Sequence, residues 1–251
     1  QHSFGVSATV FVSPNKRFDN QALSLNTNRQ RQLDSTFTTA SGSTRNTSNI
    51  ALNASHTFNL ADSETQLVTQ ANYVTYSADR AQDVETNYFS PSGLQLRNNN
   101  FNTTGNQDST IFTGQIDLSI PLTSGALDWG LKISDIKTSS AQNFFDQTEQ
   151  GAVLNSSFSD DFQYQENIFA AYFNITRDWE QWSLDLGLRA EQTEVMATSK
   201  NLGEVNNQYY FELFPKMSLL YTANQNNSFG LTYSRSIARP NYESLNPFTE
   251  S

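Results

Sequence analysis

The stretch Trp182–Glu191 constrains the fold more than any other part of the sequence. Its even positions from Trp182 to Leu188 are Trp, Leu, Leu and Leu, whereas its odd positions from Ser183 to Glu191 are Ser, Asp, Gly, Arg and Glu. Separation with a period of two is the pattern of a β-strand, because a helix would mix the two sets. One face is apolar and the other carries charge, which a globular core would not accept unpaired. The pattern is typical of a closed barrel in a lipid bilayer, with apolar residues facing acyl chains and polar residues facing the lumen.

The same alternation recurs along the chain and predicts an all-β fold with about ten antiparallel, up-and-down strands. The stretch Tyr164–Ser236 alone is expected to form two consecutive hairpins. The expected strands are 4–12, 18–37, 50–60, 66–76, 112–120, 127–133, 164–176, 182–191, 213–221 and 228–236.

The expected connections differ in length between the two ends of the strands. Short turns are predicted after the odd strands, and longer connections after the even ones; the short turns are Pro14–Lys16, 61–64, 121–125, 177–180 and 223–227. The longer connections are a reversal at Ser41–Ser43, two long loops at 78–108 and 139–162, and a polar connection at 198–207. This favours a membrane barrel, with periplasmic turns, extracellular loops and odd strands running down, over a soluble sandwich.

The composition supports strands and loops and argues against several other classes. Hydrophobic residues make up 36% of the 251 residues, below the roughly 45–50% of ordinary domains. Aromatic residues reach 12%, so the composition is not that of a disordered chain. The net charge of -10 and the absence of a basic patch argue against a nucleic-acid partner.

Cysteine is absent, which excludes disulfides and cysteine-based metal or redox sites. No apolar run approaches the ~20 residues of a membrane helix, so a membrane location requires a closed barrel. The chain starts within an expected strand and lacks an initiator methionine, so we expect a fragment or a processed product.

Charged residues at alternate strand positions are expected to face the lumen. They are Asp128, Lys132, Asp185, Arg189, Glu191, Glu212 and Lys216. They could contact a plug or a solute, or they could form cross-strand ion pairs that hold the wall; the sequence leaves both interpretations open.

Aromatic residues near the short turns are interpreted as a girdle at the level of the lipid headgroups. They are Trp129, Trp179, Trp182 and Tyr221. The alternative is ordinary packing of aromatic residues on a sheet. Tyr88, Phe89, Phe144 and Phe145 fall in the predicted long loops and are the candidates for ligand contact, since loops carry recognition.

Catalytic and metal-binding sites are not indicated. His2 and His56 are the only histidines, and His56 shares a strand face with apolar residues, which indicates a structural position. Asp160 and Asp161, with Asp146 and Glu149 nearby, could bind a cation, but they lack the spacing of a calcium loop and are interpreted as a solvated acidic loop. We therefore expect neither an enzyme nor a cofactor nor a metal.

The end of the chain resembles a segment of TonB-dependent outer-membrane receptors of the type common in Bacteroidota. The segment reads Tyr233-Ser-Arg-Ser-Ile-Ala-Arg239-Pro240, followed by Leu245-Asn246-Pro247-Phe248. Glu166–Tyr172, Trp182–Glu191 and Phe214-Pro215 are also similar, so the resemblance covers about residues 164–248. Arg239, Pro240, Leu245, Asn246, Pro247 and Phe248 are interpreted as structural residues that stop a strand and stiffen a loop.

The resemblance implies a function in the outer membrane of a Gram-negative bacterium. It implies a large barrel around an N-terminal plug, which takes up a scarce, unidentified solute with energy from a periplasmic TonB-type protein. Residues 1–251 would form one partial barrel domain without the plug. Outer-membrane lipid or lipopolysaccharide and a surface lipoprotein or larger envelope complex are the other expected partners. A secreted or surface β-sandwich binding module and a small stand-alone barrel or pore are the alternatives.

Overall fold

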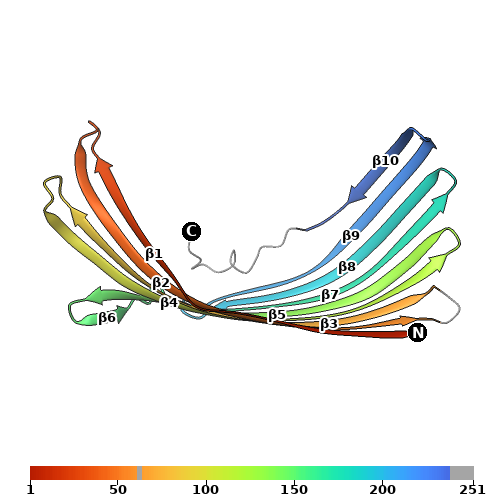
Figure 1. The fold of residues 1–251 in the computed structure, drawn as a ribbon, viewed down its shortest axis with the longest axis horizontal. Helices are drawn as coiled ribbons and strands as arrows, with labels where there is room; N and C mark the ends of the chain where they lie inside the picture. Colours follow the sequence, from red (N-terminus) through yellow and green to blue (C-terminus); the bar gives the residue numbers. More distant parts are fainter. Residues whose placement is uncertain (61–63, 238–251) are drawn as a thin grey trace.

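The computed structural model describes residues 1–60 and 64–237, and nearly all of them lie in long β-strands (Figure 1). The strands are β1 (His2–Thr27), β2 (Leu33–Asn59), β3 (Gln66–Phe89), β4 (Gln95–Leu122), β5 (Gly125–Thr148), β6 (Gly151–Leu154), β7 (Asp160–Trp179), β8 (Trp182–Ser199), β9 (Glu204–Asn224) and β10 (Asn227–Ser234). In the described ranges no helix combines the length and apolar character needed to cross a membrane.

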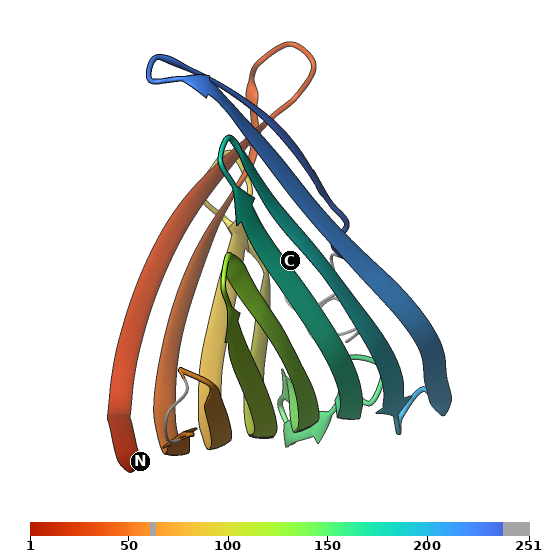
Figure 2. The ribbon, with the colours of Figure 1, turned by 90° about the vertical axis from the view of Figure 1, so that its right-hand side faces the viewer.

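The strands form one antiparallel sheet in which each strand pairs with its neighbours along the chain. The order is β1-β2-β3-β4-β5-β7-β8-β9-β10, and the short β6 pairs with the end of β5. The sheet is strongly curved, and its strands run side by side at a common tilt (Figures 1 and 2). The all-β class and the ten antiparallel strands are therefore confirmed, whereas a second sheet, as in a sandwich, is not formed by the described residues.

Two of the predicted reversals are wrong, because the sheet continues through them. Pro14–Lys16 is a β-bulge inside β1, where the register shifts between Ser13 and Lys16. Ser41–Ser43 lies in the middle of β2 and pairs with both β1 and β3. The first three predicted strands are thus two longer ones, and residues 4–12 run in the direction opposite to the one predicted. Proline and asparagine suit a bulge as well as a turn, since both break the regular ladder.

The two long predicted loops are also wrong, since most of their residues extend β3, β4 and β5. The β3–β4 register runs without a break from Gln66–Ser119 to Tyr88–Arg97, and only residues 90–94 connect the strands. Amide side chains support this part of the ladder: Asn98 Nδ2 donates to Asn87 Oδ1 at 2.6 Å, and Asn87 Nδ2 donates to Glu85 Oε1 at 2.9 Å. Residues 198–207 also form the ends of β8 and β9, joined by a turn at 200–203.

The two faces of the sheet differ in polarity over the half that lies next to the short turns. We call the face that carries Leu131, Phe173 and Leu186 the outer face. Its residues there form a largely apolar band, in which Thr69, Arg177 and the two histidines are polar exceptions. The band spans 2–12, 50–58, 67–73, 112–122, 127–133, 169–179, 182–190, 209–221 and 229–233. Most of these spans are close to the ~9–11 residues that a strand needs to cross a bilayer. Beyond the band the outer face becomes polar.

The opposite face, which we call the inner face, carries Lys132, Tyr172 and Arg189 and is the more crowded one. Its buried side chains include Thr193 at 0% exposure and Phe162 at 3%. Phe162, Tyr164, Val195 and Ala197 form a small cluster on β7 and β8. Because side chains crowd on the inside of a curved sheet, this burial identifies the inner face as the concave one.

Candidate functional site

The inner face at the height of the apolar band holds the candidate site. By register it carries all the charged residues predicted to face the lumen: Asp128, Lys132, Asp185, Arg189, Glu191, Glu212 and Lys216. They lie on three strands, β5, β8 and β9. Only β7 separates β5 from β8 in the sheet, so the strand pairing gathers the seven residues into one patch. Their contact with a solute or a plug stays a prediction.

Ion pairs on neighbouring positions order this patch. Arg189 binds Glu191 through Nε at 2.9 Å and Nη2 at 2.8 Å, and the Glu191 side chain is only 4% exposed. Lys216 Nζ lies 2.6 Å from Asp185 Oδ2. Glu212 pairs with Arg235, which belongs to the C-terminal motif but was not predicted to face the lumen. These pairs hold the wall, and they also present charged groups to whatever fills the concave side.

The sequence reasoning did not predict a hydrogen-bonded group around Tyr172. Tyr172 Oη donates to Asp117 Oδ1, and Gln115 Nε2 donates to Asp117 Oδ2 at 2.7 Å. The Tyr172 ring lies across Gly130, which sits between Asp117 and Tyr172 in the register. A Cβ at Gly130 would come within 2.5 Å of the Tyr172 hydroxyl and 2.6 Å of Asp117 Oδ1. A glycine inside a strand is the available sequence signal for such a close cross-strand approach.

Replacing Gly130 with alanine should push the Tyr172 ring away from Asp117. The lost hydrogen bond to a carboxylate is expected to cost about 1.5–3 kcal/mol of stability. Gly105→Ala is the matched control, because a Cβ there meets only Ala141 O at 3.7 Å. Urea titration of the folded protein in detergent measures both variants, and equal losses would contradict the role given to Gly130.

The patch borders a pocket of about 400 Å³ on the concave side. Its lining includes Gln115, Lys132, Tyr172, Arg189, Phe214 and Lys216. The guanidinium of Arg189 lies 5.7 Å from the centroid of the Tyr172 ring. The pocket can therefore offer amide, hydroxyl and cationic groups to a polar partner.

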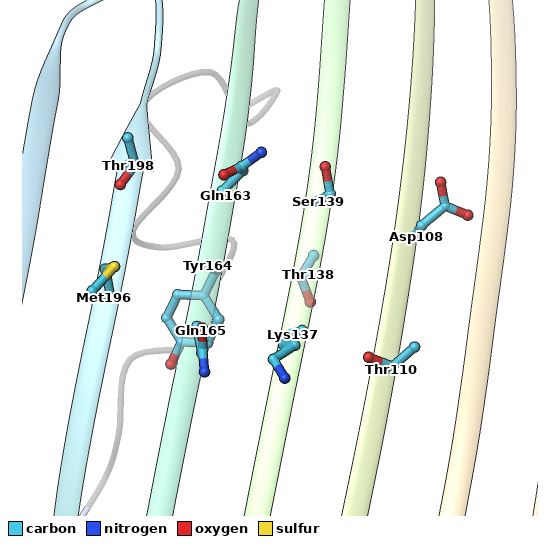
Figure 3. A pocket seen from close by; sticks show the side chains of 10 residues that line it. All are labelled: Asp108, Thr110, Lys137, Thr138, Ser139, Gln163, Tyr164, Gln165, Met196 and Thr198. Carbon is cyan, nitrogen blue, oxygen red and sulfur yellow. The ribbon is translucent and has the colours of Figure 1, made fainter.

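A second pocket, of about 370 Å³, lies across β4, β5, β7 and β8 just beyond the apolar band (Figure 3). Asp108, Lys137, Gln165 and Met196 are among its lining residues and share the outer face by register. Lys137 forms an ion pair with Asp135 at 3.1 Å. This region marks the change of the outer face from apolar to polar.

The predicted girdle residues all lie on the outer face. Trp179 pairs with Trp182, and Trp182 pairs with Tyr221, so these three residues form one row next to the short turns. The ring centroids of Trp182 and Tyr221 lie 4.5 Å apart. Trp129 lies on β5, in the row of Phe173 and Leu188. Leu188 is six residues further along β8 than Trp182, so Trp129 lies farther from the short turns than the other three. Their position at the lipid headgroups stays a prediction.

The aromatic candidates for ligand contact lie in strands and not in loops, which corrects their predicted setting. Tyr88 and Phe89 end β3, and Phe144 and Phe145 belong to β5. Tyr88 and Phe144 are on the inner face: Arg97 lies over the Tyr88 ring at 3.9 Å, and Phe144 stacks on Phe101 at 4.6 Å. Phe89 and Phe145 are on the outer face by alternation, so the four residues do not form one site.

The histidines and the acidic residues have structural partners. His2 Nδ1 and His56 Nε2 lie 3.0 Å apart on the outer face, so each histidine has the other as a partner. Asp161 pairs with Lys200 at 2.6 Å. Asp160 is 4% exposed and accepts a hydrogen bond from the Asn201 N–H, so a solvated loop does not describe it.

The six C-terminal motif residues that were interpreted as structural lie outside the described part of the chain. They are Arg239, Pro240, Leu245, Asn246, Pro247 and Phe248.

A curved antiparallel sheet with an apolar convex band and a charged concave face is the wall of a membrane β-barrel. The sequence matches the outer membrane protein beta-barrel family over residues 56–251. The chain therefore belongs to this family of outer-membrane proteins. None of the curated proteins matches it significantly.

Solved structures of receptor barrels are similar to the chain at low identity. The siderophore receptor PiuA from Acinetobacter baumannii is 11% identical, with a TM-score of 0.44, and the match covers 92% of this chain and 49% of PiuA. The ferric-catecholate import receptor Fiu from E. coli K12 is 10% identical, with a TM-score of 0.39, over 92% of this chain and 50% of Fiu. The ferric citrate transporter FecA is 13% identical, with a TM-score of 0.36, and the match covers 88% of this chain and 42% of FecA. The chain spans about half the length of these receptors.

Proposed function

We propose that the chain forms part of the wall of a TonB-dependent outer-membrane receptor that takes up a scarce solute. The observation that carries the proposal is the charged inner face at the height of the apolar band, with its ion pairs and its pocket of about 400 Å³. A wall of this kind suits a lumen that holds a polar plug and passes a polar solute. The resemblance of residues 164–248 to TonB-dependent receptors adds support.

The proposal assigns a partner to each face of the sheet. The apolar band of the outer face contacts lipid, and the polar surface beyond it meets the headgroups of lipid or lipopolysaccharide. On the inner face, a plug would couple the barrel to a periplasmic TonB-type protein. The proposal also includes a surface lipoprotein or a larger envelope complex as a partner. The proposed function is transport and not catalysis, and both histidines lie on the outer face, away from the inner pocket.

The turns at the two ends of the sheet define its expected orientation. Residues 90–94 and 200–203 lie at one end, and residues 123–124, 180–181 and 225–226 at the other. Ser92→Cys should therefore react with a membrane-impermeant maleimide on intact cells, whereas Gln225→Cys should react only after the outer membrane is opened. The reverse labelling pattern would contradict the orientation.

Growth under nutrient limitation tests the transport function. A strain without this protein should grow poorly when one scarce solute, such as iron, a vitamin, an oligosaccharide or a peptide, is limiting. In a strain that already lacks the TonB-type protein, the same deletion should have no further effect. A defect that persists undiminished in that background would overturn the proposal.

A further inference from the structure

The pocket of about 370 Å³ on the outer face lies where the apolar band ends, and two rows of side chains line it (Figure 3). The row nearer the band is Thr110, Lys137, Gln165 and Met196, and the next row is Asp108, Ser139, Gln163 and Thr198. Thr110 is two residues beyond Phe112 of the band, about 7 Å along the strand at about 3.4 Å per residue. The headgroup layer adds about 5–8 Å to each side of a bilayer core, so the pocket is at the height expected for lipid headgroups.

The pocket carries one cation and one anion on adjacent strands. Lys137 of β5 is the diagonal neighbour of Asp108 of β4, because Asp108 pairs directly with Ser139. Diagonal neighbours in a sheet lie roughly 7–8 Å apart. The Lys137 ammonium lies 3.1 Å from Asp135, while Asp108 is exposed and has no hydrogen-bond or ion-pair partner among the residues that the structure describes. A ligand with charges of both signs can therefore bind between Lys137 and Asp108.

The ion pair that holds Lys137 is a weak one. Asp135 precedes Lys137 by two residues on the same strand, and the Lys137 side chain is 57% exposed. Exposed pairs of this kind contribute little to stability, because water and salt screen them. A phosphate group can therefore compete with Asp135 for Lys137 through a charge-assisted hydrogen bond.

Neutral side chains around the two charges suit the remainder of a lipid molecule. The side-chain amides of Gln163 and Gln165 have no hydrogen-bond partner in the described part of the chain, so they can donate to phosphate or ester oxygens. Met196 is 50% exposed in the pocket and offers an apolar contact outside the band. Towards the band, Ile133 and Phe169 pair with each other and continue the surface into the hydrocarbon region.

The surrounding charges disfavour a headgroup that is only anionic. On the outer face of β4, β5, β7 and β8, three carboxylates lie between the band and the far row of the pocket: Asp108, Asp135 and Glu194. Lys137 is the single cation in the same region. A phosphate alone would meet more repulsion than attraction there. A headgroup that also carries an amine gains from both signs of charge.

We propose that this pocket binds a membrane lipid whose headgroup carries both a phosphate and a primary amine. The phosphate binds Lys137, the amine binds Asp108, and the acyl chains lie on the apolar band. In phosphoethanolamine two carbons separate the amine from the phosphate ester, which suits charges at diagonal positions of a sheet. The site specifies the chemistry of the headgroup partner in the proposed function, but it depends neither on a plug nor on the uptake of a solute.

Native mass spectrometry of the protein, isolated in nonionic detergent, tests the site. The probes are phosphatidylethanolamine, phosphatidylcholine and phosphatidylglycerol with identical acyl chains, added as an equal mixture. Phosphatidylcholine lacks an N–H donor, and phosphatidylglycerol lacks the amine. Phosphatidylethanolamine should therefore bind about tenfold better than either, in line with a hydrogen bond between charged groups.

Variants separate the two halves of the headgroup. Asp108→Asn should remove the preference for phosphatidylethanolamine over phosphatidylglycerol without weakening the binding of phosphatidylglycerol. Lys137→Gln should weaken the binding of both lipids about tenfold, because both carry the phosphate. Arg17→Gln is the matched control and should change nothing. Arg17 also forms an exposed ion pair with an acidic residue two positions away, Asp19 at 3.0 Å, but it lies on β1 outside the pocket.

Three results would overturn the site: equal binding of the three lipids, a preference that survives Asp108→Asn, or an Arg17→Gln effect as large as that of Lys137→Gln. Free phosphoethanolamine should not compete with the lipid, because it lacks the acyl chains. Effective competition would overturn the assignment to a lipid in favour of a soluble compound. None of these results depends on growth or uptake, so failure of the lipid site is distinguishable from failure of the transport function.

Discussion

Replacing Leu131 with arginine is expected to destabilise the protein in lipid by about 2–4 kcal/mol, the cost of a cation near the middle of the membrane on the lipid face of a barrel. Leu131 is 50% exposed in the apolar band and pairs with Ile116 and Ala171. Arginine at this position would have to leave the hydrocarbon or draw water into it. Urea titration of the protein folded in lipid vesicles measures the change.

Ser134→Arg is the matched control on the same strand. Ser134 lies three residues away on the inner face, in the row of Thr113 and Ile168, where an arginine can reach the polar lumen. It should cost much less than Leu131→Arg. Equal losses, or a larger loss for Ser134→Arg, would contradict the assignment of the two faces.

The second large effect is expected for Glu191→Gln, which leaves Arg189 without its ionic partner. Removing one member of a buried pair typically costs about 3–5 kcal/mol, because the remaining charge is uncompensated. The Arg189 side chain is 33% exposed and gains some solvation, so a loss of about 2–3 kcal/mol is expected.

The exposed pair Arg17–Asp19 is the control for this prediction. Its side chains are 71% and 62% exposed, and their separation of 3.0 Å is close to that of Arg189 and Glu191. Asp19→Asn should produce no measurable change in the urea midpoint, because water and salt screen such a pair. Similar changes in both variants would show that burial does not set the strength of the inner pairs.

The part of the fold inside the apolar band could be predicted from sequence because lipid imposes one rule on every outer position. Trp182–Glu191 shows this rule clearly, and the strands at 112–120 and 127–133 follow it as well. Beyond the band both faces are polar, so alternation of hydrophobicity disappears and extended strands resemble loops. Residues 78–108 were misread for this reason.

For the candidate site, the alternation of apolar and polar residues predicts which side chains face inward, but not which of them contact one another. The alternation of side chains along a strand places Arg189 and Lys132 on the inner face. The residues that they contact depend on the register between strands, which the sequence does not show. Tyr172 and Asp117 meet because β4, β5 and β7 align them around Gly130. Lys16 was misread as part of a turn, since a bulge held by the side chain of Asn46 on another strand has no local signature.

The most direct test of the central claim is single-cysteine labelling along β8 in native outer membranes. The chain contains no cysteine, so no background reaction from these residues interferes. Cysteine at Leu184, Leu186 or Leu188 should react with a lipid-soluble maleimide and resist a water-soluble one, whereas cysteine at Ser183, Asp185 or Arg189 should react with the water-soluble reagent. Alternation of this kind would place β8 in the membrane, with one face in lipid and the other in a wet lumen. Equal reaction of all positions with the water-soluble reagent would contradict the account.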